Sequence, residues 1–412
     1  MSSGLRSGLV RATRIARDDG ARALPQRAAR LVYDRLGAAG VSEPLLDDDI
    51  ADSTTLDLPL PSVRPTRGSR LRIGWVMVPP SGGSGGHTTL FRMIEALEAA
   101  GHECVVLLYD RYGGDLGEQA AVIRRWWPAV RADVRDARTG VAGLDACVAS
   151  GWESAHVMAT RGRGPMRRLY FVQDYEPYFY PRGPRYALAE DSYRFGYRCI
   201  ALGEMVAGLL RDEVGVAPDV AEFGCDTTVY RLLPERPRSG VVFFARPDYA
   251  RRGYWLGRVA LQRFHERHPD IDVHVYGAVV HDLGFPAVQH GRLAPTELNE
   301  LYNGVVAGLC LSFTNVSLVP EEMLAAGAVP VANDDPYSRA VLRSEHVQWA
   351  APSPDALAAA LSRVVTAGRI AARARLAAGS ATERGWVASQ ADVVRIVEDE
   401  VFGPAGGGTV TE

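Results

Sequence analysis

The stretch LSFTNVSLVPEEMLAAGAVPVANDD, residues 311–335, decides the fold class, because it combines the signals of a strand, a polar loop, a helix and a second strand. Pro320 suits the first turn of a helix, where its missing N–H removes no hydrogen bond. Glu321 and Glu322 follow in that turn, where acidic side chains interact favourably with the helix dipole. Gly327 ends the helix, and the apolar residues after it are typical of a buried strand.

This arrangement places two carboxylates and several loop side chains beyond the C-terminal end of a strand. The loop supplies Thr314, Asn315 and Ser317, and the carboxylates lie at a helix N-terminus. Ligands of open α/β sheets bind at that position. Two solvated glutamates beside an ordinary helix cap would give the same pattern, so the stretch alone leaves both interpretations open.

The composition excludes several function classes. The chain has 412 residues, 47% of them hydrophobic, which suffices for a large core and suggests two domains. A net charge of −3 gives no indication of a nucleic-acid partner. All 46 Lys+Arg residues are arginines, so a lysine Schiff base and a P-loop lysine are excluded. An anionic ligand must therefore be bound by arginine, backbone N–H groups or histidine.

The cysteines and the hydropathy pattern indicate a reducing compartment. The five cysteines are scattered and form no C-x-x-C pair, which argues against a disulfide framework or a zinc site. The nine histidines form no metal-binding pattern, and we expect no metal and no cofactor. No apolar span reaches transmembrane length and no signal peptide is present, so we expect a cytoplasmic location, with the inner face of the membrane as an option.

Strand and helix patterns alternate from Leu71 to the last helix, which predicts parallel sheets. A short linker at 234–240 divides the alternation into two series. We therefore expect an α/β fold of two tandem Rossmann-like, doubly wound domains with an interdomain cleft. The expected segments are an Arg-rich helical segment (1–40), an extended linker (41–70), the two domains (71–235 and 236–380), a C-terminal helix that could cross back to the first domain (381–403) and a disordered tail (404–412).

Two acidic or basic features of the N-terminal region are ambiguous. The segment 1–40 fits a helix packed on its own protein or a partner, and it also fits a cationic helix on a membrane surface. Asp47–Asp49 could suggest a metal motif. Their proline-rich surroundings and the lack of a nearby phosphate loop favour a solvated loop.

The first domain carries a glycine-rich turn, PPSGGSGG at 79–86, between a strand and a helix. It lacks G-x-G-x-x-G, so we expect Gly85 and Gly86 to let an acceptor approach the backbone beside His87. The turn also matches the nucleophile-elbow pattern around Ser84, but the sequence identifies no acid and histidine partners for it.

In the second domain, arginines occur just after predicted strands: Arg246, Arg251, Arg252 and Arg292. Two arginines facing one crevice would bind a diphosphate through charge-assisted hydrogen bonds and stabilise it as a leaving group. Ordinary surface arginines in a lysine-free protein are the alternative.

The first domain also contains an aromatic cluster, YFVQDYEPYFYP at 170–181. Asp174 could orient an acceptor hydroxyl or remove its proton, and Glu176 could bind a hydroxyl. Tyr175 and its aromatic neighbours could stack on sugar rings. Structural packing of an aromatic loop is the alternative.

Four segments together resemble the GT-B glycosyltransferases: SGGSGGH (81–87), FFARPDYARRG (243–253), HGRLAPTELNELYNG (290–304) and SLVPEEMLAAGAVPVAND (317–334). The last two resemble the nucleotide-sugar site of the large retaining family 4. The segment FVQDYEPYFYP (171–181) and the long N-terminal segment resemble those of the WsaF-type rhamnosyltransferases.

The resemblance implies roles for individual residues. Glu322 would bind the nucleotide ribose, and Arg246 with Arg251 or Arg252 would bind the diphosphate. Arg292 would add a phosphate contact. The loop would offer hydroxyl and N–H groups to phosphate and sugar from Thr314, Asn315, Ser317 and Leu318. The family pattern has a further glutamate eight residues before Glu322, and this chain has Thr314 there.

The resemblance implies a glycosyltransferase that needs no metal. We expect transfer of a sugar, L-rhamnose from dTDP-L-rhamnose, onto a polysaccharide or glycolipid of the cell surface. The partners would be a nucleotide-sugar donor and a glycan or lipid-linked glycan acceptor, with no nucleic acid. The alternatives are a transferase using UDP- or GDP-linked sugars, a sugar-nucleotide epimerase of similar fold, and a non-enzymatic glycan-binding scaffold.

Overall fold

The computed structural model describes residues 43–234, 236–316, 318–381 and 385–404. The expectations for the helical segment 1–40, for Ser317 and for the tail after 404 lie outside these residues. The chain divides into two units, Met1–Ile50 and Ala51–Glu412. In the first unit, Asp47–Asp49 form a 3-10 turn in which Asp49 is buried. The interpretation of all three aspartates as a solvated loop is therefore wrong for Asp49.

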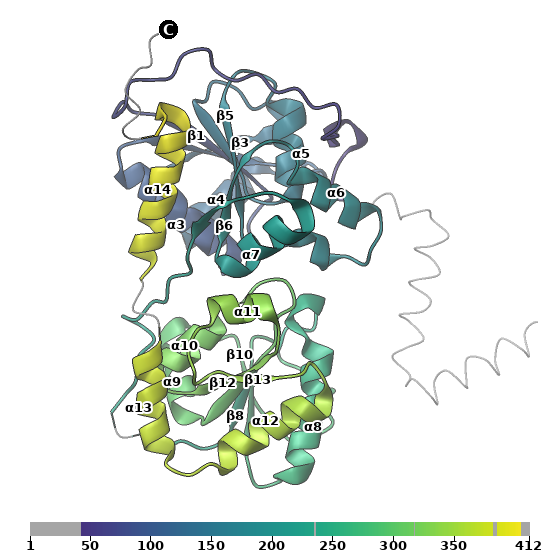
Figure 1. The fold of residues 1–412 in the computed structure, drawn as a ribbon, viewed down its shortest axis with the longest axis vertical. Coiled ribbons are helices and arrows are strands. Elements are labelled where there is room, and N and C mark those ends of the chain that lie inside the picture. Colours follow the sequence, from purple (N-terminus) through teal and green to yellow (C-terminus); the bar gives the residue numbers. More distant parts are fainter. Residues whose placement is uncertain (1–42, 235, 317, 382–384, 405–412) are drawn as a thin grey trace, which may run out of the picture. The chain divides into compact units, whose positions relative to one another are not determined.

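The first sheet of the second unit has seven parallel strands in the order β3-β2-β1-β4-β5-β6-β7 (Figure 1). The order reverses between β1 and β4, which defines a topological switch point. The strands are β1 (Arg72–Met77), β2 (Glu103–Leu108), β3 (Asp133–Asp136), β4 (Ala146–Ala149), β5 (Arg167–Val172), β6 (Arg198–Leu202) and β7 (Asp219–Ala221). The helices are α3 (Gly85–Ala99), α4 (Leu116–Trp126), α5 (Trp152–Arg161), α6 (Pro184–Ser192) and α7 (Glu204–Leu209).

The second sheet has six parallel strands in the order β10-β9-β8-β11-β12-β13, with its switch point between β8 and β11. The strands are β8 (Val241–Phe244), β9 (Val273–Tyr276), β10 (Val288–Gly291), β11 (Ala307–Cys310), β12 (Val329–Asn333) and β13 (Gln348–Ala350). The helices are α8 (Tyr254–Arg267), α9 (Pro295–Gly304), α10 (Val319–Ala325), α11 (Pro336–Val341), α12 (Pro354–Thr366) and α13 (Ile370–Ser380). Two doubly wound α/β domains are thus confirmed.

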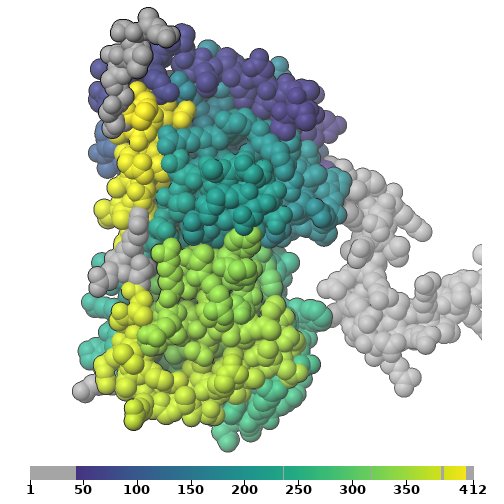
Figure 2. Space-filling model, in the orientation of Figure 1, coloured from purple at the N-terminus to yellow at the C-terminus, as the bar shows by residue number. Residues whose placement is uncertain are grey.

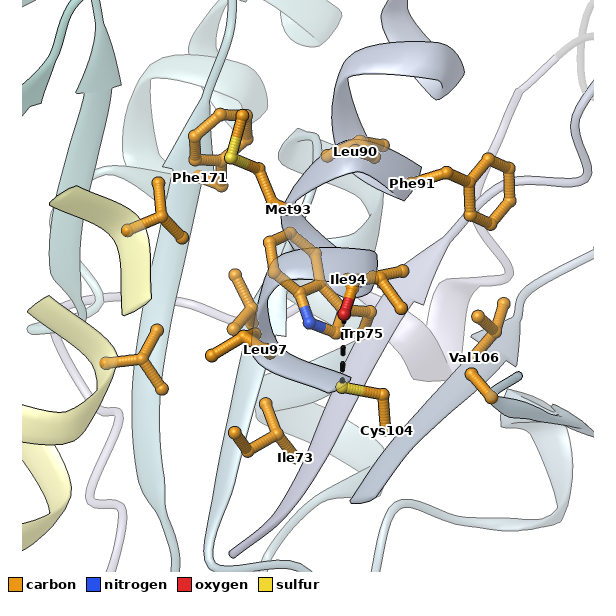
Figure 3. Packing of buried hydrophobic residues seen from close by; sticks show 14 of the residues in the cluster. Ile73, Trp75, Leu90, Phe91, Met93, Ile94, Leu97, Cys104, Val106 and Phe171 are labelled. Atoms are coloured by element: carbon orange, nitrogen blue, oxygen red, sulfur yellow. Dashed lines mark hydrogen bonds between the residues drawn. The ribbon is translucent and has the colours of Figure 1, made fainter. Parts of the chain in front are cut away.

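The core of the first domain forms between its sheet and α3. Trp75 lies at its centre, and its ring meets the edge of Phe171 at a centroid distance of 6.1 Å (Figure 3). Ile94 and Leu97 of α3 are fully buried in the same cluster, which follows from their spacing along one helix face. Cys104 packs here as a small apolar residue and its thiol contacts the carbonyl of Ile94 at 3.8 Å.

The last helix, α14 (Trp386–Phe402), belongs to the core of the first domain, although it follows the second domain in the chain. Val393, Ile396 and Val397 are fully buried in the cluster that contains Trp75. The helix packs against α3 and β7, and Figures 1 and 2 show it in yellow on the surface of that domain. We expected one helix over 381–403; the structure instead ends α13 at Ser380 and begins α14 at Trp386.

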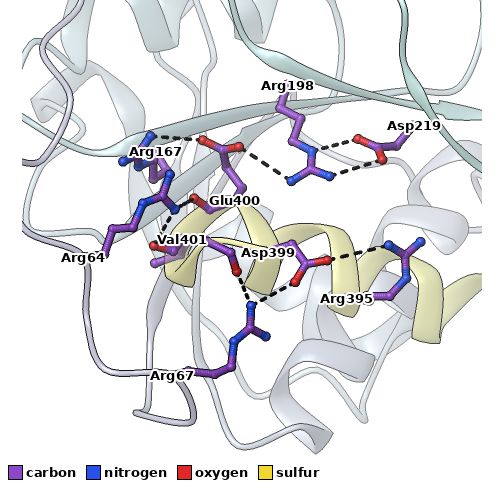
Figure 4. A network of polar contacts seen from close by, with 10 residues as sticks. Arg64, Arg67, Arg167, Arg198, Asp219, Arg395, Asp399, Glu400 and Val401 are labelled. Carbon is purple, nitrogen blue, oxygen red and sulfur yellow. Dashed lines mark hydrogen bonds and ion pairs between the residues drawn. The ribbon is translucent and has the colours of Figure 1, made fainter. Parts of the chain in front are cut away.

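Ion pairs fix the C-terminal end of α14 to the first domain (Figure 4). Glu400 lies 3.5 Å from Arg167 and 3.7 Å from Arg198, which also binds Asp219 at 2.7 Å. Arg67, from the extended linker, pairs with Asp399 at 3.0 Å. Partly exposed pairs each add little stability, but together they fix the direction in which the helix crosses.

Candidate functional site

Three arginines follow β8 at the switch point of the second sheet. Arg246 is the second residue after the strand, and Arg251 and Arg252 lie in a 3-10 turn (Ala250–Arg252). The turn ends at Gly253, which has a φ of 61°. A Cβ atom at Gly253 would lie 3.0 Å from the side chains of Leu311 and Phe313, so a side chain is excluded for two reasons.

Tyr249 organises two of these arginines. Its ring stacks under the guanidinium of Arg246 at 4.3 Å and under that of Arg251 at 5.1 Å. Arg251 also stacks on Phe179 of the first domain at 4.4 Å. Among the described residues, the recorded side-chain contacts of both arginines are with aromatic rings and include no ion pair with a carboxylate, and the buried Nε of Arg251 has no hydrogen-bond partner. Two cations held by aromatic rings, without a carboxylate partner, have the chemistry that an anion-binding site requires.

Arg252 has a different role. It donates to the Oγ of Ser312 at 2.9 Å and makes a longer contact, 3.5 Å, with the carbonyl of Asn315. Burial lowers the pKa of Arg252, and the positive charges of Arg251 and Arg246 lower it further, whereas Asp174 acts in the opposite direction. Arg252 thus shapes the loop after β11 and adds to the local positive charge.

That loop, residues 311–316, contacts the first domain. Thr314 and Asn315 are buried. The hydroxyl of Thr314 donates to Oδ1 of Asp174 at 2.7 Å. The side-chain amide of Asn315 donates to the carbonyl of Gln173, after β5, and to that of Leu202, at the end of β6, the latter at 3.2 Å. These two residues therefore join the strand ends of the first sheet to the switch point of the second.

Glu322 lies on α10, and burial raises its pKa to about 7. A hydrogen bond from the hydroxyl of Tyr230 and the positive charge of Arg92 lower this pKa, while the negative charge of Asp226 raises it. The buried phenols Tyr276 and Tyr302 also lie near this carboxyl group. A carboxyl group with such an environment, near the end of a sheet, is typical of a ligand-binding position.

On the predicted acceptor side, both ring nitrogens of His87 already contact other groups of the protein. His87 contacts the Oγ of Ser84 at 2.9 Å through Nδ1, and the carbonyl of Val78 at 3.1 Å through Nε2. Burial lowers the pKa of His87, which favours the neutral ring with its proton on Nε2. Ser84 thus has a histidine neighbour, but that histidine is oriented by a carbonyl and not by a carboxylate. A Cβ atom at Gly85 would meet nothing within 4 Å, so open space adjoins this turn.

Two residues that we expected to bind the acceptor, Tyr175 and Glu176, instead make contacts within the protein. The ring of Tyr175 is buried and stacks on the ring of Tyr193 at a centroid distance of 5.7 Å. The expectation that Tyr175 stacks on a sugar is therefore wrong in this structure, because surrounding rings cover it. The carboxylate of Glu176 accepts a hydrogen bond from the backbone N–H of Trp152, the first residue of α5. Helix capping explains this position without an acceptor.

Arg292 stands apart from the arginine cluster. It is exposed and follows β10, and β9 separates that strand from β8. Neighbouring strands lie about 4.8 Å apart, so the two strand ends are about 10 Å apart. Sequence reasoning also missed Tyr249, whose place between arginines in FFARPDYARRG was the available signal.

No group of three or more metal-ligating side chains occurs among the described residues. Within the same residues, no helix combines the length and the apolar character needed to span a membrane.

Comparison with known proteins shows which families the two domains resemble. Residues 239–362 match the family model described as WsaF, C-terminal domain, and residues 140–205 match the one described as WsaF, N-terminal domain. Both domains of the chain are thus similar to the corresponding domains of the WsaF-type GT-B glycosyltransferases. The resemblance inferred from the sequence motifs is thereby confirmed. The chain is also 32% identical over 331 residues to the O-antigen biosynthesis protein RfbC of Myxococcus xanthus. The match covers 75% of the chain but 25% of RfbC, so the chain spans about a quarter of that protein's length.

Solved structures share the fold of this chain. HepE of Anabaena, in complex with UDP-glucose, aligns with a TM-score of 0.62 at 14% identity, over 80% of this chain and 100% of HepE. TarM of S. aureus, in a complex that includes UDP, aligns with a TM-score of 0.62 at 8% identity, over 80% and 99% of the two chains. A putative UDP-N-acetylglucosamine 2-epimerase of Listeria monocytogenes aligns with a TM-score of 0.53 at 10% identity, over 80% and 96%. At these identities the likeness concerns the fold.

Proposed function

We propose that this protein transfers a sugar from a nucleoside-diphosphate donor to a glycan acceptor in the synthesis of a surface polysaccharide. The observation that carries this proposal is the unneutralised pair Arg246 and Arg251, stacked on Tyr249 at the switch point of the second sheet. A diphosphate supplies two or three negative charges to such a pair. The same groups would stabilise the diphosphate as it leaves the sugar, when its charge increases.

Glu322 completes the donor site in this proposal. A carboxylate accepts hydrogen bonds from the two hydroxyl groups of a ribose, or from the single hydroxyl of a deoxyribose. Asn315 and Leu318 would line the sugar and phosphate side, because they belong to the same loop and helix start as Glu322. Ser317 would add a hydroxyl group there. Arg292 would contact the donor only if the end of β10 moved closer to the end of β8.

On the acceptor side, the proposal uses Asp174 and the turn containing Gly85 and Gly86. The open space beside Gly85 would admit an acceptor hydroxyl. Asp174 would orient that hydroxyl and accept its proton. His87 and Glu176 would then act on the acceptor indirectly, by shaping the turn and by capping α5.

The finer proposal names L-rhamnose, transferred from dTDP-L-rhamnose. The match of both domains to WsaF models supports it, as does the replacement of a family carboxylate by Thr314, which suits a donor sugar with fewer hydroxyl contacts. We propose a cytoplasmic location, in reach of nucleotide sugars.

Thermal shift with dTDP, UDP and GDP, followed by turnover of the corresponding sugar nucleotides, tests the proposal. We expect stabilisation by dTDP above the other two, and loss of that stabilisation in Arg246→Ala. Arg343→Ala removes an exposed arginine of the same domain and serves as the matched control. If no nucleoside diphosphate raises the melting temperature, the proposed donor site is wrong.

A sugar-nucleotide epimerase is the second candidate, because the epimerase of Listeria monocytogenes shares the fold. An epimerase would convert its nucleotide sugar in the absence of any acceptor. Product analysis by chromatography, with and without acceptor, separates the two activities: release of free nucleoside diphosphate that depends on acceptor supports the transferase.

A further inference from the structure

A hydrogen bond joins Thr314 to Asp174, which lies 140 positions away in the chain. The sequence motifs gave no indication of this contact. The donor is the hydroxyl of Thr314, which is fully buried, and the acceptor is Oδ1 of Asp174 at 2.7 Å. The carboxylate of Asp174 is partly exposed, and the structure records no partner for its Oδ2 among the described residues. One oxygen is thus held by the protein while the other faces an accessible space.

The surroundings place this carboxylate beside the arginine cluster. Asp174 acts electrostatically on Arg252, which lies next to Arg251 in the turn after β8. Its main chain is fixed as well, because the carbonyl of Asp174 accepts a hydrogen bond of 3.3 Å from the hydroxyl of Tyr193. The carboxylate therefore sits at the boundary between the proposed diphosphate site and the proposed acceptor side.

Resting on the proposed function, we propose that Thr314 is a positioning residue for Asp174 and not a ligand of the donor sugar. A threonine hydroxyl has a single proton, and in this structure that proton goes to Asp174. The bond fixes the rotation of the carboxylate and leaves Oδ2 directed at the acceptor. In the reaction, the acceptor oxygen forms a bond to the anomeric carbon and the bond between that carbon and the diphosphate oxygen breaks. The acceptor proton passes to Oδ2 of Asp174, and the nucleoside diphosphate leaves with the electron pair.

The residue next to Thr314 holds the same loop in place. The side-chain amide of Asn315 donates to the carbonyls of Gln173 and Leu202, so the loop that carries Thr314 is fixed to two strand ends of the first domain. These contacts keep the hydroxyl of Thr314 within hydrogen-bond distance of Asp174.

Kinetics of Thr314→Val, Thr314→Ser, Asp174→Asn and the double variant Thr314→Val/Asp174→Asn test the proposal. Valine keeps the shape of threonine and removes the donor, while serine keeps the hydroxyl. We expect Thr314→Val to lower kcat about tenfold to a hundredfold with less than a threefold change in donor KM. Thr314→Ser should retain at least a third of wild-type kcat, and the double variant should be no slower than Asp174→Asn alone.

The alternatives give different results. If Thr314 binds the donor sugar, Thr314→Val will raise donor KM and will slow the Asp174→Asn background by its full factor, and the proposal is wrong. If the contact only stabilises the fold, Thr314→Val will lower the melting temperature while kcat per folded molecule stays at the wild-type value, which also overturns it. Failure of the wild-type protein to turn over any nucleotide sugar would instead count against the proposed function.

Discussion

Glu322→Gln should stabilise the unliganded protein at high pH while weakening nucleotide binding. Burial raises the pKa of Glu322 to about 7 from the ordinary value of 4.5. Below pH 4.5 the group is protonated in both the folded and the unfolded chain, so it carries no electrostatic penalty. As the pH rises, the unfolded chain releases the proton first, and the favourable contribution of the protonated group is lost by the time the pH passes about 7. Glutamine does not titrate, so it avoids this loss.

The difference between a pKa of about 7 and the ordinary 4.5 corresponds to about 3 kcal/mol as an upper value. Glu322 keeps some accessible surface in the structure, so solvent screening reduces that value. We therefore expect the stability difference between Glu322→Gln and the wild type to shift by about 1–3 kcal/mol in favour of the variant between pH 5 and pH 8. For a domain of this size, that shift equals about 3–10 °C in melting temperature.

The assay is thermal unfolding of wild type, Glu322→Gln and the control Glu345→Gln, an exposed carboxyl group of the same domain, at pH 5 and pH 8. Calorimetric titration with dTDP and with thymidine at pH 8 completes it. Loss of the carboxylate that is proposed to bind the ribose should lower the affinity for both dTDP and thymidine about tenfold to a hundredfold. A stability difference that is the same at both pH values would refute the assignment of a buried, protonatable Glu322, and unchanged thymidine affinity would refute its role at the ribose.

Two further predictions concern the arginine turn. Gly253→Ala should destabilise the protein by about 1–3 kcal/mol, because the residue adopts a positive φ beside Leu311 and Phe313. Thermal unfolding measures this change. The control Gly304→Ala, at a position with open space around it, should differ little from the wild type. Arg251→Lys should raise donor KM about tenfold, because lysine keeps the charge but loses the planar stack between Phe179 and Tyr249; an unchanged KM in steady-state kinetics would contradict that role.

The local structure of the opening stretch was predictable because its signals lie close together in the chain. Pro320 and Gly327 mark the ends of a helix by backbone geometry alone, and α10 occupies Val319–Ala325 between β11 and β12. Gly327 adopts a φ of 81°, as a helix-ending glycine does. Local rules also gave the alternation that defines both sheets.

The contacts of individual site residues were not predictable, because they depend on distant partners. The aromatic run at 170–181 indicated a cluster, but no periodicity distinguishes the buried Tyr175 from Tyr178, which is 40% exposed. Similarly, Arg252 and Arg251 are adjacent in the chain, yet Arg252 bonds to Ser312 while Arg251 stacks between rings. Tertiary packing decides these differences.

The most informative residue is Thr314, which stands where the family pattern has a glutamate. The structure supplies a physical reason for it. A glutamate at 314 would bring a second carboxylate next to Asp174, where like charges at short range raise the energy of the ionised pair. Threonine instead donates to Asp174 and leaves one carboxyl group at the boundary of the two proposed ligand sites. The exchange Thr314→Glu with Asp174→Thr would move that carboxylate to the second domain while keeping the pair's charge. If position, and not only the presence of a carboxylate, governs the reaction, the exchanged protein will bind dTDP but will not transfer sugar.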